Sequence, residues 1–318
     1  MRENKANYFV LPLVTTRSTM KLGYIGLGKM GYNMAERLLE KGHQLVVFNR
    51  SEDPVKRISK HGAQPVASLQ SLVTALSPPR LIWLMVPYQA VEEIINGLVP
   101  FLQKNDTVID GGNSPYKESM RRARELEQRG IDFLDAGVSG GPAGARNGAC
   151  IMIGGRKEIF RKHEKLFQDL SVEQGYGYMG RSGAGHFVKM VHNGIEYGMM
   201  QALAEGFSVM RASPFDLDLT GVADLYNHKS VIESRLVGWL KNAFEQHGKD
   251  LSEVSGSVAE SGEGLWTVEA AKEFGIPMPI IKGAHDFRLE SQNKPSYTGR
   301  IVSALRHQFG GHEVKKKN

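Results

Sequence analysis

The sequence predicts an α/β protein in two parts, a doubly wound parallel sheet followed by an all-α domain. Three observations predict this class. Short apolar strands alternate with amphipathic helices over about the first 180 residues, as in βαβ units with right-handed crossovers. Strand signals then stop, and helical periodicity continues. The chain has 318 residues, which is long enough for two domains.

The predicted elements of the first part follow in order along the chain. Its strands are expected at residues 21–25, 44–48, 81–86, 107–110, 132–136 and 150–153. Its helices are expected at about residues 30–41, 91–102, 118–129 and 157–170. Gly42 and Gly130 can end the first and third of these helices, because glycine readily adopts the left-handed conformation that follows a helix.

The second part is predicted to be helical throughout, with helices at about 186–211, 216–228, 229–247, 264–274 and 280–292. We place the domain boundary near residue 181 and expect domains at 20–181 and 182–318. Met20 immediately precedes the first strand. Residues 1–19 are therefore expected to be a disordered extension, an upstream start or a cloning remnant.

Composition restricts the class of protein. Hydrophobic residues make up 41% and charged residues 23%, as in folded globular proteins. The net charge of +6 comes from dispersed bases, apart from Lys315–Lys317, so we expect no nucleic-acid partner. A single cysteine, Cys150, excludes an internal disulfide and fits a reducing compartment. Since no apolar run approaches about 18 residues, we expect no membrane segment and a cytoplasmic location.

A glycine-rich loop predicts a dinucleotide site. The run Gly26–Gly31 reads G-x-G-x-x-G between the first strand and the first helix, the context of a Rossmann-type fold. The first two glycines permit a tight turn and close approach of a pyrophosphate. The third permits close packing of helix and strand. The predicted cofactor contacts of this loop are Gly26, Leu27, Gly28, Lys29, Met30 and Gly31.

The end of the second strand predicts which cofactor binds. An acidic residue there would bind the ribose 2′-hydroxyl of NAD, but the chain has Asn49, Arg50 and Ser51. The Arg50 guanidinium can contact a 2′-phosphate and Ser51 can donate a hydrogen bond to it. NADP is therefore favoured over NAD.

Five polar residues share one face of the predicted helix at 186–211. They follow the spacing i, i+3, i+4, i+7, i+8 and are Lys189, His192, Asn193, Glu196 and Tyr197. Such a stripe is either a solvated helix face or a site that holds a base and an acid. Nearby glycines allow a ligand to approach, and the upstream dinucleotide loop needs a catalytic partner, so we favour a site.

These motifs resemble 6-phosphogluconate dehydrogenase, in the shorter-chain branch of the β-hydroxyacid dehydrogenases. The resemblance covers residues 21–313. The motifs that carry it are Gly26–Asn33 with Asn49–Ser51, Asp110–Ser114, Ser139–Gly141, Gly183–Gly198 and Leu305–His312. The Lys-x-x-His-Asn-x-x-Glu-Tyr element and the final Arg306 and His312 are specific to this branch.

The resemblance implies oxidative decarboxylation of 6-phosphogluconate to ribulose 5-phosphate and CO₂. In this reaction Lys189 takes the proton of the C3 hydroxyl as hydride leaves for the nicotinamide. Lys189 then returns that proton to the 3-keto oxygen, and Glu196 protonates C1 of the resulting enediol. A β-keto acid loses CO₂ readily beside a cation, so no metal is expected.

The resemblance also implies the remaining contacts of a phosphosugar acid. Ser139, Gly140 and Gly141 would bind the carboxylate end, His192 and Asn193 the hydroxyls, and Tyr197 the 6-phosphate. Val86 and Asn113 would contact the cofactor, and Asn113 also the substrate. Arg306 and His312 would reach the phosphate of substrate in a neighbouring subunit. These contacts imply a homodimer or homotetramer with the active site near the subunit interface.

The chain departs from the longer members of the family in two ways. It has room for one copy of their helical unit, and Ser261 and Glu263 stand where they have a Lys and a Thr. Glu263 would repel a phosphate, and Arg288 is expected to supply the missing positive charge.

Two other functions remain open. One is a β-hydroxyacid dehydrogenase for a small unphosphorylated acid such as 3-hydroxyisobutyrate, which would have no use for Glu196, Arg306 or His312. The other is a non-catalytic protein that senses the cofactor and binds a partner. The presence of Lys189 argues against the second.

Overall fold

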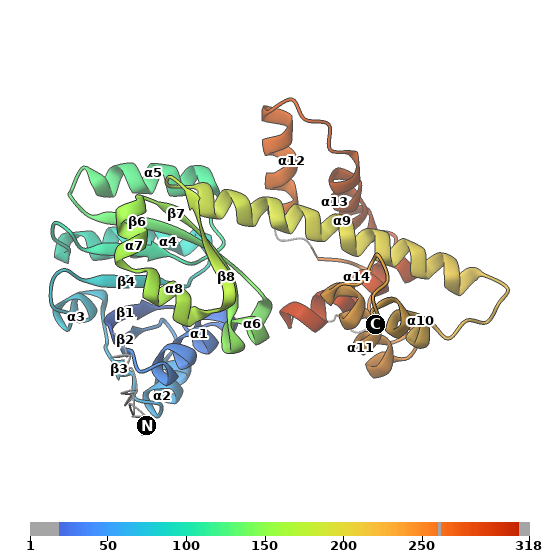
Figure 1. Cartoon of the computed structure of the whole chain (residues 1–318), viewed down its shortest axis with the longest axis horizontal. Coiled ribbons are helices and arrows are strands. Elements are labelled where there is room, and N and C mark those ends of the chain that lie inside the picture. The colour runs from blue at the N-terminus through green and yellow to red at the C-terminus, as the bar shows by residue number, and fades with distance from the viewer. Residues whose placement is uncertain (1–18, 260–261, 312–318) are drawn as a thin grey trace, which may run out of the picture.

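The computed structural model describes residues 19–259 and 262–311. Its first part is an eight-stranded sheet in the order β3-β2-β1-β4-β5-β6-β7-β8 (Figure 1). The strands are β1 (Lys21–Ile25), β2 (Gln44–Phe48), β3 (Gln64–Pro65), β4 (Leu81–Leu84), β5 (Thr107–Asp110), β6 (Asp132–Ser139), β7 (Ala149–Gly155) and β8 (Ser171–Gly180). The α/β class and the parallel arrangement of β1 to β6 are confirmed.

Helices cover both faces of this sheet (Figure 1). They are α1 (Lys29–Glu40), α2 (Glu52–Ser59), α3 (Leu69–Thr74), α4 (Tyr88–Leu98), the 3₁₀ helix η1 (Val99–Phe101), α5 (Tyr116–Glu127), α6 (Gly141–Asn147), α7 (Lys157–Lys162) and α8 (Glu164–Leu170). Because both faces are covered, all four residues of β4 are buried, which explains its uninterrupted apolar sequence.

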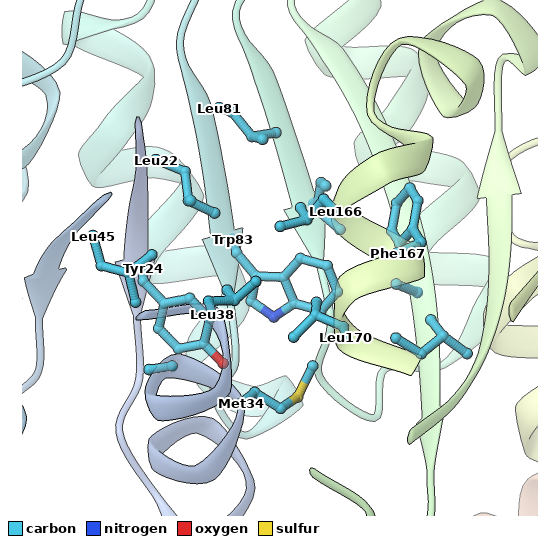
Figure 2. Packing of buried hydrophobic residues seen from close by; sticks show 14 of the residues in the cluster. Leu22, Tyr24, Met34, Leu38, Leu45, Leu81, Trp83, Leu166, Phe167 and Leu170 are labelled. Atoms are coloured by element: carbon cyan, nitrogen blue, oxygen red, sulfur yellow. The ribbon is translucent and has the colours of Figure 1, made fainter. Parts of the chain in front are cut away.

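One core lies between the sheet, α1 and α8 (Figure 2). Trp83 of β4 fills its centre beside Tyr24 of β1, and the rings of Trp83 and Phe167 lie 6.1 Å apart. A second core on the opposite face contains Ile82 and Leu84 of the same strand. The two cores hold the sheet rigid, so the loops at its carboxyl edge have fixed starting points.

The far edge of the sheet differs from the predicted pattern. β7 runs antiparallel to β6, because only residues 140–148 join them and a parallel crossover needs about a dozen residues or more. β8 was not predicted, since it is a half-exposed edge strand rich in polar residues and glycine. The helix expected at 157–170 divides at His163 into α7 and α8.

The second part is helical, and α9 connects it to the sheet (Figure 1). The helices are α9 (Ala184–Ala212), α10 (Leu219–Tyr226), α11 (Arg235–His247), α12 (Glu263–Glu273), α13 (Pro279–Ser291) and α14 (Tyr297–Gly310). α14 was not predicted from the sequence, and its first turn is capped by the Ser296 hydroxyl. Phe207 and Phe244 lie in the helical core, with ring centroids 5.7 Å apart.

Within residues 19–259 and 262–311, no helix has both the length and the apolar character needed to span a membrane. The predicted extension at 1–19 lies outside the described residues except for Thr19.

Candidate active site

The beginning of α9 is fixed against the sheet by one buried carboxylate. Asp135 of β6 accepts hydrogen bonds from the backbone N–H of Gly183 at 2.6 Å and of His186 at 2.9 Å. A side chain at Gly137 of β6 would collide with the stem of Lys189. The glycine therefore allows α9 to lie directly on the sheet, and this contact places Lys189 at the carboxyl edge of β6.

Lys189 is buried, with 9% of its surface exposed, and its Nζ donates to Oδ1 of Asn193. Burial lowers the pKa of this amine below its usual range, while the negative charges of Glu196 and Glu263 act in the opposite direction. A lowered pKa increases the neutral fraction, and the neutral amine is the form that can accept a proton.

Glu196 lies two turns further along α9 than Lys189, and its pKa is shifted in the opposite direction. Burial raises the pKa of the carboxyl group, and the charges of Lys189 and Arg288 only partly oppose this shift. The carboxyl group is thereby biased toward its protonated form, which can donate a proton. An amine biased toward neutrality beside a carboxyl group biased toward protonation is a suitable base–acid pair.

His192 is oriented by hydrogen bonds on both ring nitrogens. Nδ1 lies 3.2 Å from Oδ1 of Asn193, and Nε2 lies 3.2 Å from the Ser139 hydroxyl. A proton on Nδ1 satisfies both contacts, since Nε2 can then accept from Ser139. Burial lowers the pKa of His192, which favours this neutral form.

Lys189, Asn193 and Glu196 border a cavity of about 330 Å³ between the sheet and the helical part. The predicted residues that line it are Asn113, Ser139, Gly140, Gly141, Lys189, Asn193, Glu196, Tyr197, Arg288 and Arg306. His192 instead faces an adjoining apolar groove. His312 lies outside the described residues.

One end of the cavity is cationic. The Arg288 guanidinium stacks on the Tyr197 ring, 3.2 Å from its centroid, and burial lowers the pKa of Arg288 to about 10, so it stays charged at neutral pH. Arg306 is buried at the same cavity. The Tyr197 hydroxyl is buried and has no hydrogen-bond partner among the described residues. Two cations and a free hydroxyl are suited to bind a phosphate.

Arg306 was expected to serve a neighbouring subunit, and that expectation stays a prediction. Within its own chain Arg306 lines the cavity, because α14 packs along α9 and contacts α6. There the Phe309 carbonyl fills the space beside Gly141, and the Lys29 amine donates to the Gly311 carbonyl at 2.6 Å.

A second cavity of about 420 Å³ lies over the glycine-rich loop. Gly26 has φ +100°, and a Cβ there would collide with the Met85 carbonyl, so the turn requires glycine. The Asn49 side chain accepts from the Leu27 N–H at 2.9 Å and shapes the same loop. Gly28, Lys29, Met30, Gly31, Val86 and Asn113 are the predicted cofactor contacts that line this cavity. This loop at the start of α1 fits a dinucleotide pyrophosphate.

Arg50 and Ser51 lie at the end of β2, and both are exposed. They are therefore free to meet the ribose end of a cofactor that enters over β1 and α1. Among the described residues, no three His, Cys, Asp or Glu side chains form a group that could hold a metal ion.

The structure adds Glu263 to the site, a residue that the sequence marks only as a departure from the longer family members. Glu263, the first residue of α12, lines both cavities and accepts a hydrogen bond from the Asn113 amide. Its neighbour Trp266 borders the cofactor cavity. The sequence signal that could have indicated a functional role for this segment is the Gly-x-Gly-x-Trp-Thr run at 262–267.

Comparison with known proteins identifies both parts of the chain. Residues 21–180 match the model of the NAD-binding domain of 6-phosphogluconate dehydrogenase, and residues 185–318 match its C-terminal domain. YqeC of Bacillus subtilis, provisionally named a 6-phosphogluconate dehydrogenase, is 45% identical over 94% of this chain and its own full length. The NAD⁺-dependent decarboxylating 6-phosphogluconate dehydrogenase of Haloferax volcanii is 42% identical with the same coverage.

Solved structures show the same fold. The chain superposes on Plasmodium falciparum 6-phosphogluconate dehydrogenase with a TM-score of 0.76 and 30% identity, covering 86% of this chain and 62% of that one. A 3-hydroxyisobutyrate dehydrogenase from Salmonella typhimurium gives a TM-score of 0.71 at 18% identity, with 90% and 98% coverage.

Proposed function

The chain belongs to the 6-phosphogluconate dehydrogenase family, and from this premise we propose that it converts 6-phosphogluconate to ribulose 5-phosphate and CO₂ with reduction of NAD(P)⁺. One observation carries the proposal. A base–acid pair, Lys189 and Glu196, borders the same cavity as the cationic residues Arg288 and Arg306. This cavity adjoins the one over the glycine-rich loop, which fits a nicotinamide dinucleotide.

In this proposal, Lys189 takes the proton of the C3 hydroxyl. A bound oxidised nicotinamide supplies the hydride acceptor. Lys189, now cationic, donates its proton to the 3-keto oxygen, which draws electrons from the C1–C2 bond as CO₂ leaves. Glu196 then protonates C1 of the five-carbon enediol, which was C2 of 6-phosphogluconate. The pKa shifts of the two groups support these roles, because each is biased toward the form in which it enters the reaction.

Other residues of the cavity, together with His192 from the adjoining groove, would hold the substrate. Ser139, Gly140 and Gly141 would bind the carboxylate end, His192 and Asn193 the hydroxyls, and Tyr197, Arg288 and Arg306 the phosphate. Residues 20–181 would then form the cofactor domain and residues 182–318 the substrate domain. A cytoplasmic location remains a prediction from the sequence.

We propose NADP as the preferred cofactor, because Arg50 and Ser51 are exposed where the 2′-phosphate would lie. The Haloferax volcanii relative is named as NAD⁺-dependent, so this preference needs its own measurement. The ratio of kcat/KM with NADP to that with NAD, before and after Arg50→Ala, provides it. We expect the ratio to fall by about tenfold or more, as for loss of a charge-assisted hydrogen bond.

The chain is also proposed to form homo-oligomers. An apolar groove of about 540 Å³ runs along α9 beside the substrate cavity and shares Glu196 with it. Ile195 and Met199 are 51% and 44% exposed in this groove. Apolar side chains so close to a substrate site favour coverage by a second copy of the chain.

The reaction is tested by following nicotinamide absorbance with 6-phosphogluconate while CO₂ is trapped. We expect equal amounts of reduced cofactor and CO₂. Reduction without CO₂ would remove the decarboxylation step and the role of Glu196. No reduction with either cofactor would refute the proposal.

A second substrate class is favoured by one observation. Glu263 places a carboxylate at the cavity, and a carboxylate opposes a bound phosphate. This favours a small unphosphorylated 3-hydroxy acid. The same assay with 3-hydroxyisobutyrate separates the two, because turnover of this acid alone would establish the second class.

A further inference from the structure

Glu263 occupies a fixed position between the two cavities. It begins α12, which is attached to α9 by a hydrogen bond of 2.8 Å from the Thr267 hydroxyl to the Met190 carbonyl. Gly194 of α9 has no room for a side chain beside Thr267, so the two helices are in close contact. Because α9 also carries Lys189, the Glu263 carboxylate is held at a set position relative to the catalytic amine.

The two oxygens of this carboxylate differ. Oε1 accepts a hydrogen bond from the Asn113 amide, whereas Oε2 is buried and has no partner among the described residues. A buried carboxylate oxygen without a donor is costly, and a ligand that brings a donor removes the cost. The arrangement also orients Asn113, since its NH₂ group donates to Glu263.

The charge of the cavity restricts which group of a ligand can donate a hydrogen bond to Oε2 of Glu263. Glu263 repels the phosphate and carboxylate groups of a phosphosugar acid, which match the cationic Arg288 and Arg306 better. The hydroxyl groups between those two ends are neutral donors. Glu263 also interacts electrostatically with Lys189 and Glu196, which indicates that it faces the substrate side.

We propose that Glu263 is a specificity-determining residue whose free Oε2 accepts a hydrogen bond from a hydroxyl of a polyhydroxy acid bound against Lys189. This inference rests on the proposed function, because it assumes that class of substrate. A site built to bind a hydroxyl rejects an analogue that lacks it, since the buried acceptor then stays unpaired. Glu263 would therefore discriminate polyhydroxy acids from their deoxy analogues.

The test compares dissociation constants measured by calorimetry, without cofactor and therefore without turnover. The ligands are 6-phosphogluconate and a set of analogues that each lack one hydroxyl. The variants are Glu263→Met, which removes both acceptors at similar volume, and Glu263→Gln, which keeps an acceptor without the charge. The matched control is Glu269→Gln, an exposed position on the same helix.

We expect the wild type and the Glu269→Gln control to bind one analogue about tenfold or more weakly than the parent. In Glu263→Met the dissociation constants of analogue and parent should agree to within about twofold. Glu263→Gln should give a ratio between those of the wild type and Glu263→Met. Unchanged ratios in Glu263→Met would overturn the inference. A separate calorimetric titration with NADP gives a second way to fail. If Glu263→Met weakened only the binding of NADP, the donor would be the nicotinamide carboxamide. A wild type that neither binds nor oxidises 6-phosphogluconate would refute the proposed function itself, a distinguishable outcome.

Discussion

Lys189 and Glu196 show how burial alone can prepare two side chains for opposite tasks. In water, both groups are charged at neutral pH. In the cavity, loss of hydration disfavours both charges, which lowers the pKa of the amine and raises that of the carboxyl group. The residual attraction between them limits the shifts but does not reverse them. Burial is thus the largest cause of both shifts, and the neighbouring charges only modify them.

Replacing Lys189 with Met should abolish turnover and stabilise the fold. The lowered pKa means that the unfolded chain binds this proton more readily than the folded one, so stability rises with pH toward the usual pKa of lysine. We expect Lys189→Met to add about 1–2 kcal/mol to the free energy of unfolding at neutral pH and to flatten this rise. Urea unfolding at neutral and alkaline pH measures both effects.

Lys272→Met is a suitable control, because Lys272 is exposed on α12. It should change neither turnover nor the pH dependence of stability. Normal turnover in Lys189→Met would show that Lys189 is not the base.

The position of α9 depends on a glycine in the strand beneath it. Gly137→Ala would push a methyl group into the stem of Lys189 and displace the helix. We expect kcat to fall by about tenfold or more, since small misplacements of catalytic groups are costly. Gly206→Ala in α9 itself is the control, because a Cβ there meets nothing within 4 Å. It should leave kcat unchanged and add about 0.5–1 kcal/mol of stability. Equal kcat values in the two variants would contradict this role of Gly137.

The junction of α7 and α8 should make the fold sensitive to acid. Burial lowers the pKa of His163 to about 4, and its Nε2 lies 3.1 Å from the Thr107 hydroxyl. The unfolded chain binds the proton first, so stability is lost as pH falls from about 6.5 to about 4, by up to about 3 kcal/mol. His163→Leu should remove this part of the loss, at a cost of about 1 kcal/mol near pH 7. Urea unfolding at about pH 6.5 and about pH 4 measures the free energy of unfolding of both proteins. An equal loss of stability in His163→Leu and the wild type would show that His163 is not its cause.

The sequence was informative where periodicity and local chemistry agree. The strands β1, β2, β4, β5 and β6 and the glycine-rich loop could be predicted, because buried apolar runs and the G-x-G-x-x-G spacing are local signals. The two-residue strand β3 is exposed and was not predicted. The direction of β7 depends on the length of its connection, and β8 is too polar and glycine-rich to show strand alternation. Glu263 meets Asn113 only through the packing of α12 on α9, which no local pattern reports.

At the scale of the whole molecule, the apolar groove along α9 should control assembly. Ile195→Lys would place a charge in the groove and should shift an oligomer toward monomer in light scattering coupled to size-exclusion chromatography. Val209→Lys is the control on the same helix, since Val209 is 71% exposed and does not line the groove. A mass unaffected by Ile195→Lys would place any interface elsewhere.

The contact between Lys29 and Gly311 bears on how the protein is made. It joins two residues that are 282 positions apart, and Gly311 directly follows α14. Arg306 of α14 lines the substrate cavity. Synthesis proceeds from the N-terminus, so the sheet and its glycine-rich loop emerge from the ribosome long before α14. A nascent chain could therefore acquire the nucleotide loop early, while the cationic end of the substrate cavity would wait for the last helix.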